Sequence, residues 1–458
     1  MPTLERTRTY ASATNPCILT ATLLACVGFV DTADAEAPRD RFGTSGALES
    51  ETGPLRTGRT ASATASAPAP SEAPTGFDNV TNGYLPQGPD FDAIDEDTVS
   101  PLASFNDARF VFEEAETADD GLGPTYNAQS CRECHQNVVT GSGSKVAEHR
   151  TGRLVRGQFF ESLGGSLIHS RATHADIVER VSAQDSIRTL RLATSTLGDG
   201  FVEAIANDTL LAIRNRQPTS IRGSAVPVPV LESNGQVRIG RFGWKSQHAS
   251  LESFSADAYL NEMGITTPLL PDENTASGVF VGVGSGYDEV ADPEDDGIDV
   301  VAFAEFMRST KAPSRGPETA EAVAGADVFN QVGCVGCHVA SIATATPGTP
   351  INGGAFVVPE ALGNKVIHPY SDFLMHDVGT GDGIPVQPGL VFAATARQIR
   401  TAPLWGLRTR NRLMHDGLSF TRQDAIARHG GQAVDVRLRF ERLPSVQQRQ
   451  LLAFLDSL

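Results

Sequence analysis

The sequence has few cysteines, and none is left over for a disulfide framework. Of its 6 cysteines, Cys17 and Cys26 lie in an N-terminal apolar segment, and the other four sit in two CxxCH motifs. A disulfide-stapled fold is therefore excluded. The apolar run at residues 17–30 is too short to cross a bilayer, which excludes a membrane span at this position.

Positive charge is also in short supply. The chain has 37 Lys and Arg against 55 Asp and Glu, a formal net charge of −18. This balance argues against nucleic acid and against anionic membrane surfaces as partners. It favours basic partners or small substrates.

The N-terminus reads as an export signal, which we place at residues 1–26. Arg6 and Arg8 precede the apolar run. "LLAC" (residues 23–26) resembles a lipoprotein cleavage site, with Cys26 as the lipidated residue. "ADA" (residues 33–35) offers ordinary signal cleavage instead. Both alternatives predict a protein of the periplasm or the cell surface, and the first adds a lipid anchor.

The rest of the chain divides into three parts. Residues 27–76 are rich in Ala, Ser, Thr and Pro and predict a flexible linker. "STKAPSRGPET" (residues 309–319) marks the best boundary between two folded domains, at residues 77–315 and 316–458.

Helical periodicity is more frequent than strand alternation, so we expect a mainly α fold with short β pieces. Helices are predicted at residues 104–116, 174–184, 200–216, 318–332 and 444–458, and an acidic loop opens a further helix within residues 292–310. In the last helix Ser445 is the expected N-cap. Its buried stripe would be Leu451, Phe454, Leu455 and Leu458.

The two CxxCH motifs, "SCRECHQN" (residues 130–137) and "GCVGCHVA" (residues 333–340), predict covalent haem. Two cysteines at this spacing can form thioether bonds with the haem vinyl groups, and the next histidine then binds the iron. The predicted attachment residues are Cys131, Cys134 and His135 for one haem c and Cys334, Cys337 and His338 for the other.

Other uses of these cysteines fit less well. Zinc sites pair CxxC motifs about 15–20 residues apart, whereas Cys134 and Cys334 are far more distant in sequence. A thioredoxin-like motif needs βαβ surroundings. A helix before the second CxxCH and an amphipathic closing helix are typical of a class I cytochrome c domain, so we expect two such domains, the first with large insertions.

From residue 121 to 458 the chain resembles the bacterial di-haem oxidoreductases often labelled peroxidase or thiol oxidoreductase. This family is related to di-haem cytochrome c peroxidases and to the di-haem enzyme that matures the tryptophylquinone of methylamine dehydrogenase. One departure, "QNVVTGSGS" after the first CxxCH, affects only the local loop. The resemblance rests on "GLGPTYNAQSCRECH", "GDGFVEAI", "GRFGWK", "EMGITT", "PYSDFLMHDVG", "RTAPLWGL", "LMHDG" and "HGG".

The resemblance implies a second iron ligand for the C-terminal haem. Relatives place it fourteen residues after the histidine of an HDG motif, which here is His415, and this points to His429. "FTRQDAIARHGG" predicts a short helix capped by Thr421 that ends at His429. The alternatives are Met414 and Met375, or a histidine that only interacts with the helix dipole.

For the N-terminal haem the resemblance implies a glutamate that moves protons between the two peroxide oxygens. We expect Glu203 in this role, with burial raising its pKa; an ordinary helix carboxylate is the alternative. His169 could instead bind the iron in a resting state, whereas His149 and His174 are expected on the surface.

Relatives also place a tryptophan between the haems, for which Trp244 fits better than Trp405, although either could be an ordinary core residue. In the two "LMHD" segments, Asp377 or Asp416 could hold a histidine, or the segments could simply be turns. The acidic loop at residues 292–299 suggests a calcium site. However, Phe303 occupies loop position twelve, where a calcium-binding loop of this type needs a glutamate. An acidic helix cap fits it better.

Together these features predict an exported di-haem oxidoreductase that reduces hydrogen peroxide with electrons from a small cytochrome or a protein donor. The alternatives are a non-catalytic electron carrier with both irons six-coordinate, or a redox sensor. Coordination of the first iron separates the enzyme from the carrier.

Overall fold

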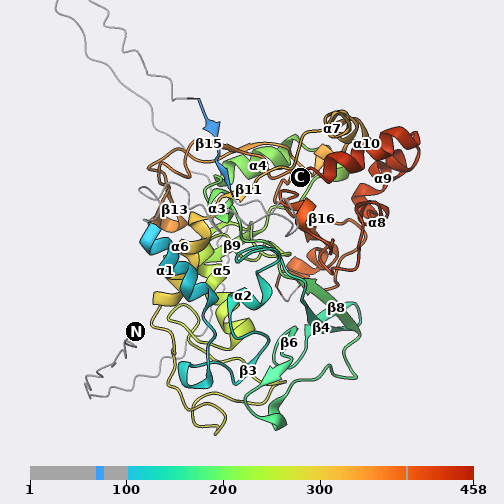
Figure 1. Ribbon diagram of the computed structural model, residues 1–458. Coiled ribbons are helices and arrows are strands. Elements are labelled where there is room, and N and C mark those ends of the chain that lie inside the picture. The colour runs from blue at the N-terminus through green and yellow to red at the C-terminus, as the bar shows by residue number, and fades with distance from the viewer. Residues whose placement is uncertain (1–68, 77–101, 388–389) are drawn as a thin grey trace, which may run out of the picture. The chain divides into compact units, whose positions relative to one another are not determined.

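The computed structural model describes residues 69–76, 102–387 and 390–458 (Figure 1). The predicted signal, its cleavage sites and most of the linker lie outside these residues. In the described part, no helix combines the length and the apolar character needed to cross a bilayer. All described residues belong to one compact unit, so the proposed boundary near residue 315 stays a prediction.

The first CxxCH motif begins in a helix, α2 (Cys131–Cys134), and the second follows directly after another, α7 (Ala320–Val332). The bounds of the α-helices are α1 (Leu102–Glu113), α2 (Cys131–Cys134), α3 (Asp199–Glu203), α4 (Asn207–Arg216), α5 (Leu251–Ala258), α6 (Ile298–Ser309), α7 (Ala320–Val332), α8 (Arg422–Ala427), α9 (Val434–Glu441) and α10 (Ser445–Leu455).

Most helix predictions are confirmed. The segments at 292–310, 318–332 and 444–458 contain α6, α7 and α10, and the segment at 104–116 overlaps α1, which begins two residues earlier. The segment at 200–216 is divided into α3 and α4.

The helix predicted at residues 174–184 is wrong, because only a 3-10 turn, Ala175–Ile177, forms there. Glu179 is buried in this segment and accepts hydrogen bonds from the backbone amides of His169 and Ser277. These tertiary contacts override the local helical preference.

Around the first motif, α1 packs against α6. The two helices meet through aromatic side chains, with ring centroids 5.6 Å apart for Phe105 and Phe306 and 4.7 Å for Phe112 and Phe306. α5 packs on the same helix α6. This aromatic contact belongs to the largest hydrophobic core of the described residues.

Around the second motif, α7 packs against α10 (Figure 1). Phe329 of α7 and Phe454 of α10 have ring centroids 5.2 Å apart. The predicted stripe of Leu451, Phe454, Leu455 and Leu458 is buried. Ser445, however, is the first residue of α10, and Pro444 occupies the N-cap position. Each motif thus follows a helix that a later helix covers, as expected for cytochrome c-like domains.

The strands form several small sheets. Their bounds are β1 (Ser71–Glu72), β2 (Thr75–Gly76), β3 (Thr125–Tyr126), β4 (Ala147–Val155), β5 (Gln158–Glu161), β6 (Leu167–Ile168), β7 (Arg171–Ala172), β8 (Ile187–Leu192), β9 (Pro227–Val230), β10 (Gln236–Ile239), β11 (Ala312–Pro313), β12 (Ile342–Ala343), β13 (Pro350–Ile351), β14 (Phe356–Val357), β15 (Lys365–Ile367), β16 (Met375–His376) and β17 (Ile399–Arg400).

The largest sheet is the main departure from the expected short β pieces. β4 pairs antiparallel with β5, β6 and β8. Most residues of the long β4 are exposed or half-buried. Buried and exposed residues therefore do not alternate along it, and the period-two pattern that predicts a strand is missing from its sequence. Among the described residues helix exceeds strand, 34% against 18%, and the fold is mainly α only in this sense.

Two strands form inside the segment that we expected to be a flexible linker. β1 pairs parallel with β15, and β2 pairs parallel with β11. The linker prediction is therefore wrong for residues 71–76. Backbone groups make these strand pairings, and the Ala-, Ser- and Pro-rich composition does not predict them.

Gly325 of α7 tests the α7–α10 packing. A Cβ at this position would stand 1.9 Å from the carbonyl oxygen of Gln450 in α10. We expect Gly325→Ala to separate the helices and lower the free energy of unfolding by about 1–3 kcal/mol, the usual cost of overpacking. Asp327→Ala on the exposed face of α7 is the control and should change stability by less than ~0.5 kcal/mol. Equal effects of the two substitutions in denaturant titrations would contradict the close packing.

Candidate functional site

Two pockets in the structure each contain one complete CxxCH motif. The first pocket is lined by Cys131, Cys134 and His135. The second is lined by Cys334, Cys337 and His338. The four cysteines are unpaired, and they belong to separate pockets, so they cannot form a four-cysteine zinc site.

In the second pocket, His429 faces His338. Their ring centroids are 6.5 Å apart. An imidazole nitrogen binds a metal at about 2 Å, so two imidazoles on one ion have centroids roughly 6–6.5 Å apart. The spacing fits a single iron between the two rings.

Hydrogen bonds orient both rings for this role. The Nδ1–H of His338 donates to the carbonyl of Tyr370 over 2.9 Å, and that of His429 donates to the carbonyl of Ala425 over 2.8 Å. Neither Nε2 has a hydrogen-bond partner among the described residues. A metal-binding histidine is usually held in this way through its second nitrogen.

The local sequence explains where His429 lies. Thr421 caps α8 by accepting a hydrogen bond from the Asp424 amide, as predicted. α8 ends at Ala427, and His429 follows within the same turn. Burial lowers the pKa of His429, and burial together with the nearby His429 lowers the pKa of His338 to about 4. Both rings are therefore neutral at pH 7, the form that binds metals.

The first pocket is different, because His135 is the only one of the 10 histidines that lines it. The Nδ1 of His135 is buried without a well-formed hydrogen bond, although the backbone of Ser142 and Thr194 lies nearby. Burial lowers the pKa of the ring. Phe112 packs edge-on against it at 6.1 Å.

Polar side chains also line the first pocket. Glu262 accepts a hydrogen bond from Asn127 and lies 3.7 Å from the guanidinium of Arg150, which pairs with Glu148 at 2.7 Å. Burial and the charge of Glu148 hold the pKa of Glu262 well above its ordinary value. Glu262 was not predicted as a site residue from the sequence, although it begins the "EMGITT" segment.

Glu203 does not line either pocket. It is fully buried and forms an ion pair with Arg308 at 2.7 Å, and it also accepts hydrogen bonds from Leu251 and Asn352. The expected rise in its pKa is wrong: burial favours a rise, but Arg308 outweighs it and the pKa is lowered. The carboxylate joins α3, α5 and α6 and is not available for proton transfer.

The other histidine candidates for the first iron also lie elsewhere. His169 is buried, and both of its ring nitrogens are engaged, with Glu179 at 2.9 Å and with the Asn261 carbonyl at 2.8 Å. It cannot serve as a resting-state ligand in this arrangement. His149 and His174 are exposed, as expected.

A shared wall separates the two pockets. Leu192, Ala193, Thr194 and Trp244 line both of them. The indole N–H of Trp244 donates to the Leu192 carbonyl over 2.7 Å, which fixes the ring against the end of β8. His415 packs edge-on against the indole at 6.1 Å. Trp405, in contrast, is an ordinary core residue.

The two "LMHD" segments differ. The second forms a turn at His415 and Asp416, where Asp416 accepts from the Leu418 amide and pairs with Arg428. The first contains β16, so the turn interpretation is wrong there, although Asp377 accepts a hydrogen bond from the Gly379 amide just beyond the strand. Neither Asp377 nor Asp416 forms a hydrogen bond with a histidine.

Of the two methionine alternatives for the second iron, only Met414 lines the second pocket. Met375 is buried in a separate core cluster.

The acidic loop caps α6. Asp296 accepts from the Ile298 amide and Asp295 from the Asp299 amide, as the cap interpretation predicts. Asp292 and Glu294 instead lie near Glu273 and Asp288, with carboxylate oxygens within 4.8 Å of one another. None of these four lines either pocket.

The pockets fit the haem groups that the motifs call for. Burial raises the pKa of Cys131, Cys134 and Cys334, so the thiols stay protonated and suit thioether bonds better than metal thiolates. The remaining lining is largely apolar, including Phe329 and Leu413 in the second pocket. These features define a haem-binding redox protein.

The comparisons with known proteins agree with this class. The family described as "Di-haem oxidoreductase, putative peroxidase" matches residues 160–458. The chain belongs to this family. The matched part contains the second CxxCH motif and His429, and begins after the first CxxCH.

Solved structures show only distant likeness. Hydrazine synthase of Kuenenia stuttgartiensis has 15% identity and a TM-score of 0.36, over 86% of this chain and 100% of its own. A MauG-like protein associated with microbial copper homeostasis has 14% identity and a TM-score of 0.37, over 85% of this chain and 93% of its own. No curated protein matches the sequence.

The structural role of Glu203 predicts the effect of its loss. Glu203→Gln would leave Arg308 as a buried charge without its ion pair, so we expect a loss of about 3–5 kcal/mol in the free energy of unfolding. Glu441→Gln, which removes the exposed pair with Arg437, is the control and should cost about 0.5 kcal/mol or less. A fully stable Glu203→Gln protein in denaturant titrations would show that the pair is not structural.

Proposed function

We propose that the chain is an exported di-haem c oxidoreductase that reduces hydrogen peroxide. The observation that carries this proposal is the difference between the pockets. The second pocket offers two facing histidines for one iron, whereas the first offers His135 alone. Haem in these pockets would supply iron that exchanges single electrons and, where a coordination position is open, admits a small oxidant.

The second pocket suits electron relay. His338 and His429 would both hold the iron of a haem bound there, one from each side, and leave no room for a substrate between them. Their Nδ1 hydrogen bonds to backbone carbonyls hold the rings in place in both redox states. A site that changes little in geometry when it gains an electron is suited to fast transfer.

The first pocket suits proton transfer to an oxidant. Reduction of one hydrogen peroxide takes two electrons and two protons and yields two water molecules. Glu262, with its raised pKa, can take a proton from one peroxide oxygen and return it to the leaving oxygen. Arg150 and Asn127 hold its carboxyl group in position.

The shared wall supports an electron route between the pockets. Trp244 contacts both, and its N–H is held by the Leu192 carbonyl. Because a carbonyl oxygen is a poor base, the indole keeps its proton as electrons pass. The electrons would come from a small cytochrome or a protein donor, and the chain would act in the periplasm or at the cell surface, with Cys26 as a lipid anchor if it is modified.

One observation favours a second candidate, a non-catalytic electron carrier. Met263 and Met307 are buried and line the first pocket. A methionine sulfur is a common haem ligand. If either side chain bound the first iron, both haems would be closed to peroxide.

Glu262→Gln tests the enzyme proposal. We expect kcat/KM for peroxide to fall by about 10²–10⁴-fold, because the amide cannot carry the proton, while mass spectrometry still finds two haems. Glu114→Gln, an exposed acid near the end of α1, is the control and should leave turnover unchanged. Unaltered turnover in Glu262→Gln would remove this residue from the reaction, and absence of turnover in the unmodified protein would favour the carrier.

His429→Ala tests the relay site. Loss of this ligand should convert the low-spin signal of the second haem into a high-spin signal in the electron paramagnetic resonance spectrum, with the first haem unchanged. The exposed His174→Gln is the matched control and should leave both signals intact. A spectrum of His429→Ala identical to that of the unmodified protein would exclude His429 as an iron ligand.

A further inference from the structure

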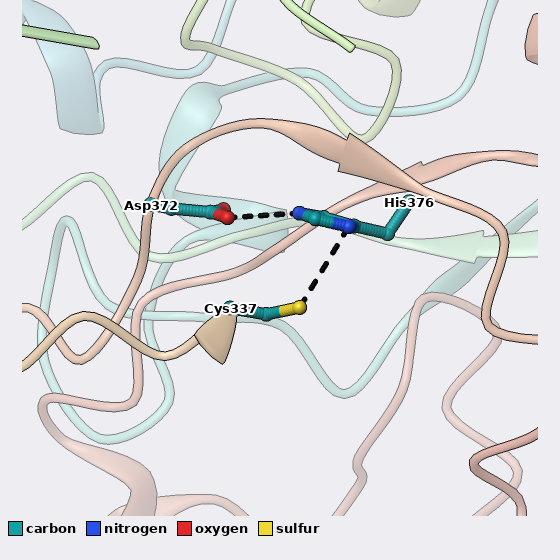
Figure 2. Close-up of side chains that lie close together, drawn as sticks. All are labelled: Cys337, Asp372 and His376. Atoms are coloured by element: carbon teal, nitrogen blue, oxygen red, sulfur yellow. Dashed lines mark hydrogen bonds and ion pairs between the residues drawn. The ribbon is translucent and has the colours of Figure 1, made fainter. Parts of the chain in front are cut away.

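A buried histidine and aspartate lie directly beside the second CxxCH motif (Figure 2). The Nδ1 of His376 lies 3.7 Å from the sulfur of Cys337, and its Nε2 lies 2.8 Å from the carboxylate of Asp372. Both side chains are almost completely inaccessible to solvent. Figure 2 shows the imidazole between the two partners, with the carboxylate at one nitrogen and the sulfur at the other.

Further hydrogen bonds tie this pair to the motif. Gln217 donates to the Asp372 carboxylate over 2.6 Å and to the carbonyl of Gly336, within the CxxCH loop, over 2.8 Å. Asp372 also accepts from the Leu374 amide over 3.0 Å. The position of the imidazole relative to Cys337 is therefore set by the fold, and the pair is part of the haem attachment site.

The arrangement resembles a metal site, but the haem chemistry argues against one. The ligand-type atoms of Cys337, Asp372 and His376 lie within 4.8 Å of one another. Once Cys337 carries the haem, its sulfur is a thioether with no charge and no hydrogen. It can then accept a weak hydrogen bond, and it no longer offers the thiolate through which a cysteine binds a metal.

The same chemistry bears on the protonation of His376. Its Nε2 donates to a carboxylate, and its Nδ1 faces a thioether sulfur, to which it can donate only if it also carries a proton. A ring that donates from both nitrogens is an imidazolium. Burial lowers the pKa of His376, and the hydrogen bond to the Asp372 carboxylate raises it; the further rise from Cys337 needs an ionisable thiol and is absent once this sulfur is a thioether.

We propose that His376 donates its Nδ1–H to the Cys337 thioether sulfur and keeps a positive charge beside the second haem, which raises the reduction potential of that haem. A ferric haem has one more positive charge than a ferrous one, so a nearby cation favours the reduced form. The negative end of the pair, Asp372, lies on the far side of the imidazole (Figure 2). His376 is thus a positioning residue that adjusts the relay.

The device is specific to the second haem. Among the described residues, no histidine nitrogen forms a hydrogen bond with Cys131 or Cys134. Two histidine ligands give a lower potential than histidine with methionine, so a relay held by His338 and His429 gains from a compensating charge. The inference rests on the proposed function in one respect, namely that Cys337 carries a haem.

The test is the midpoint potential of each haem, measured by spectroelectrochemistry on the haem-loaded protein. We expect His376→Gln to shift the potential of the second haem downwards and leave that of the first unchanged. His368→Gln, an exposed histidine paired with Glu72, is the control and should shift neither. Mass spectrometry of each protein counts the attached haems. Absence of haem at Cys337 in the unmodified protein would refute the proposed function itself.

His376→Gln leaves Asp372 buried without a cation, which can prevent folding. A second variant therefore keeps the proposal testable. The pair His376→Leu with Asp372→Asn removes both charges together, which buried ion pairs tolerate better. It should show the same downward shift. An unchanged second-haem potential in either variant, with two haems attached, would overturn the inference while leaving the proposed function intact.

Discussion

The structure depends on one constraint, the thin wall that both pockets share. Leu192 is the last residue of β8, Ala193 and Thr194 follow it, and Trp244 is fixed to this segment through the hydrogen bond from its indole to the Leu192 carbonyl. A strand that pairs with β4 on one side thus supplies the partition between two redox sites. The β sheet that follows the first CxxCH motif thus positions the partition, and each pocket contains a cysteine pair and a histidine on its own side of it.

The two sites differ because their surroundings differ. α8 presents His429 opposite His338, and the buried pair of Asp372 and His376 supports the same motif from behind. The first pocket has no second histidine and instead contains acids around Arg150. In the proposed function the pockets would divide the work of peroxide reduction, with electron storage on one side of Trp244 and proton supply on the other. The proposed charge beside Cys337 would adjust the step between them.

Much of the site could be predicted from the sequence, because its signals are local. The CxxCH motifs and the cap at Thr421 act within a few residues, whereas His429 was expected from the resemblance to di-haem relatives, which place a ligand fourteen residues after His415. Glu203 shows where such reasoning fails. An acid in an apolar run is desolvated, but its pKa depends on Arg308, a partner 105 residues away that no local pattern reveals. Glu262 and Asp372 were missed for the same reason, since their roles come from neighbours in space. β4 was not predicted because most of its residues are exposed or half-buried, so buried and exposed positions do not alternate along the strand.

The most direct test of the account is the electron paramagnetic resonance spectrum of the unmodified, haem-loaded protein before and after one equivalent of hydrogen peroxide. The account predicts two distinct haem signals, one low-spin from the His338 and His429 site and one high-spin from the His135 site in the oxidised or half-reduced state. Peroxide should change the high-spin signal first. Two low-spin signals in the oxidised protein, with peroxide altering neither the oxidised nor the half-reduced protein, would contradict it and would favour an electron carrier instead.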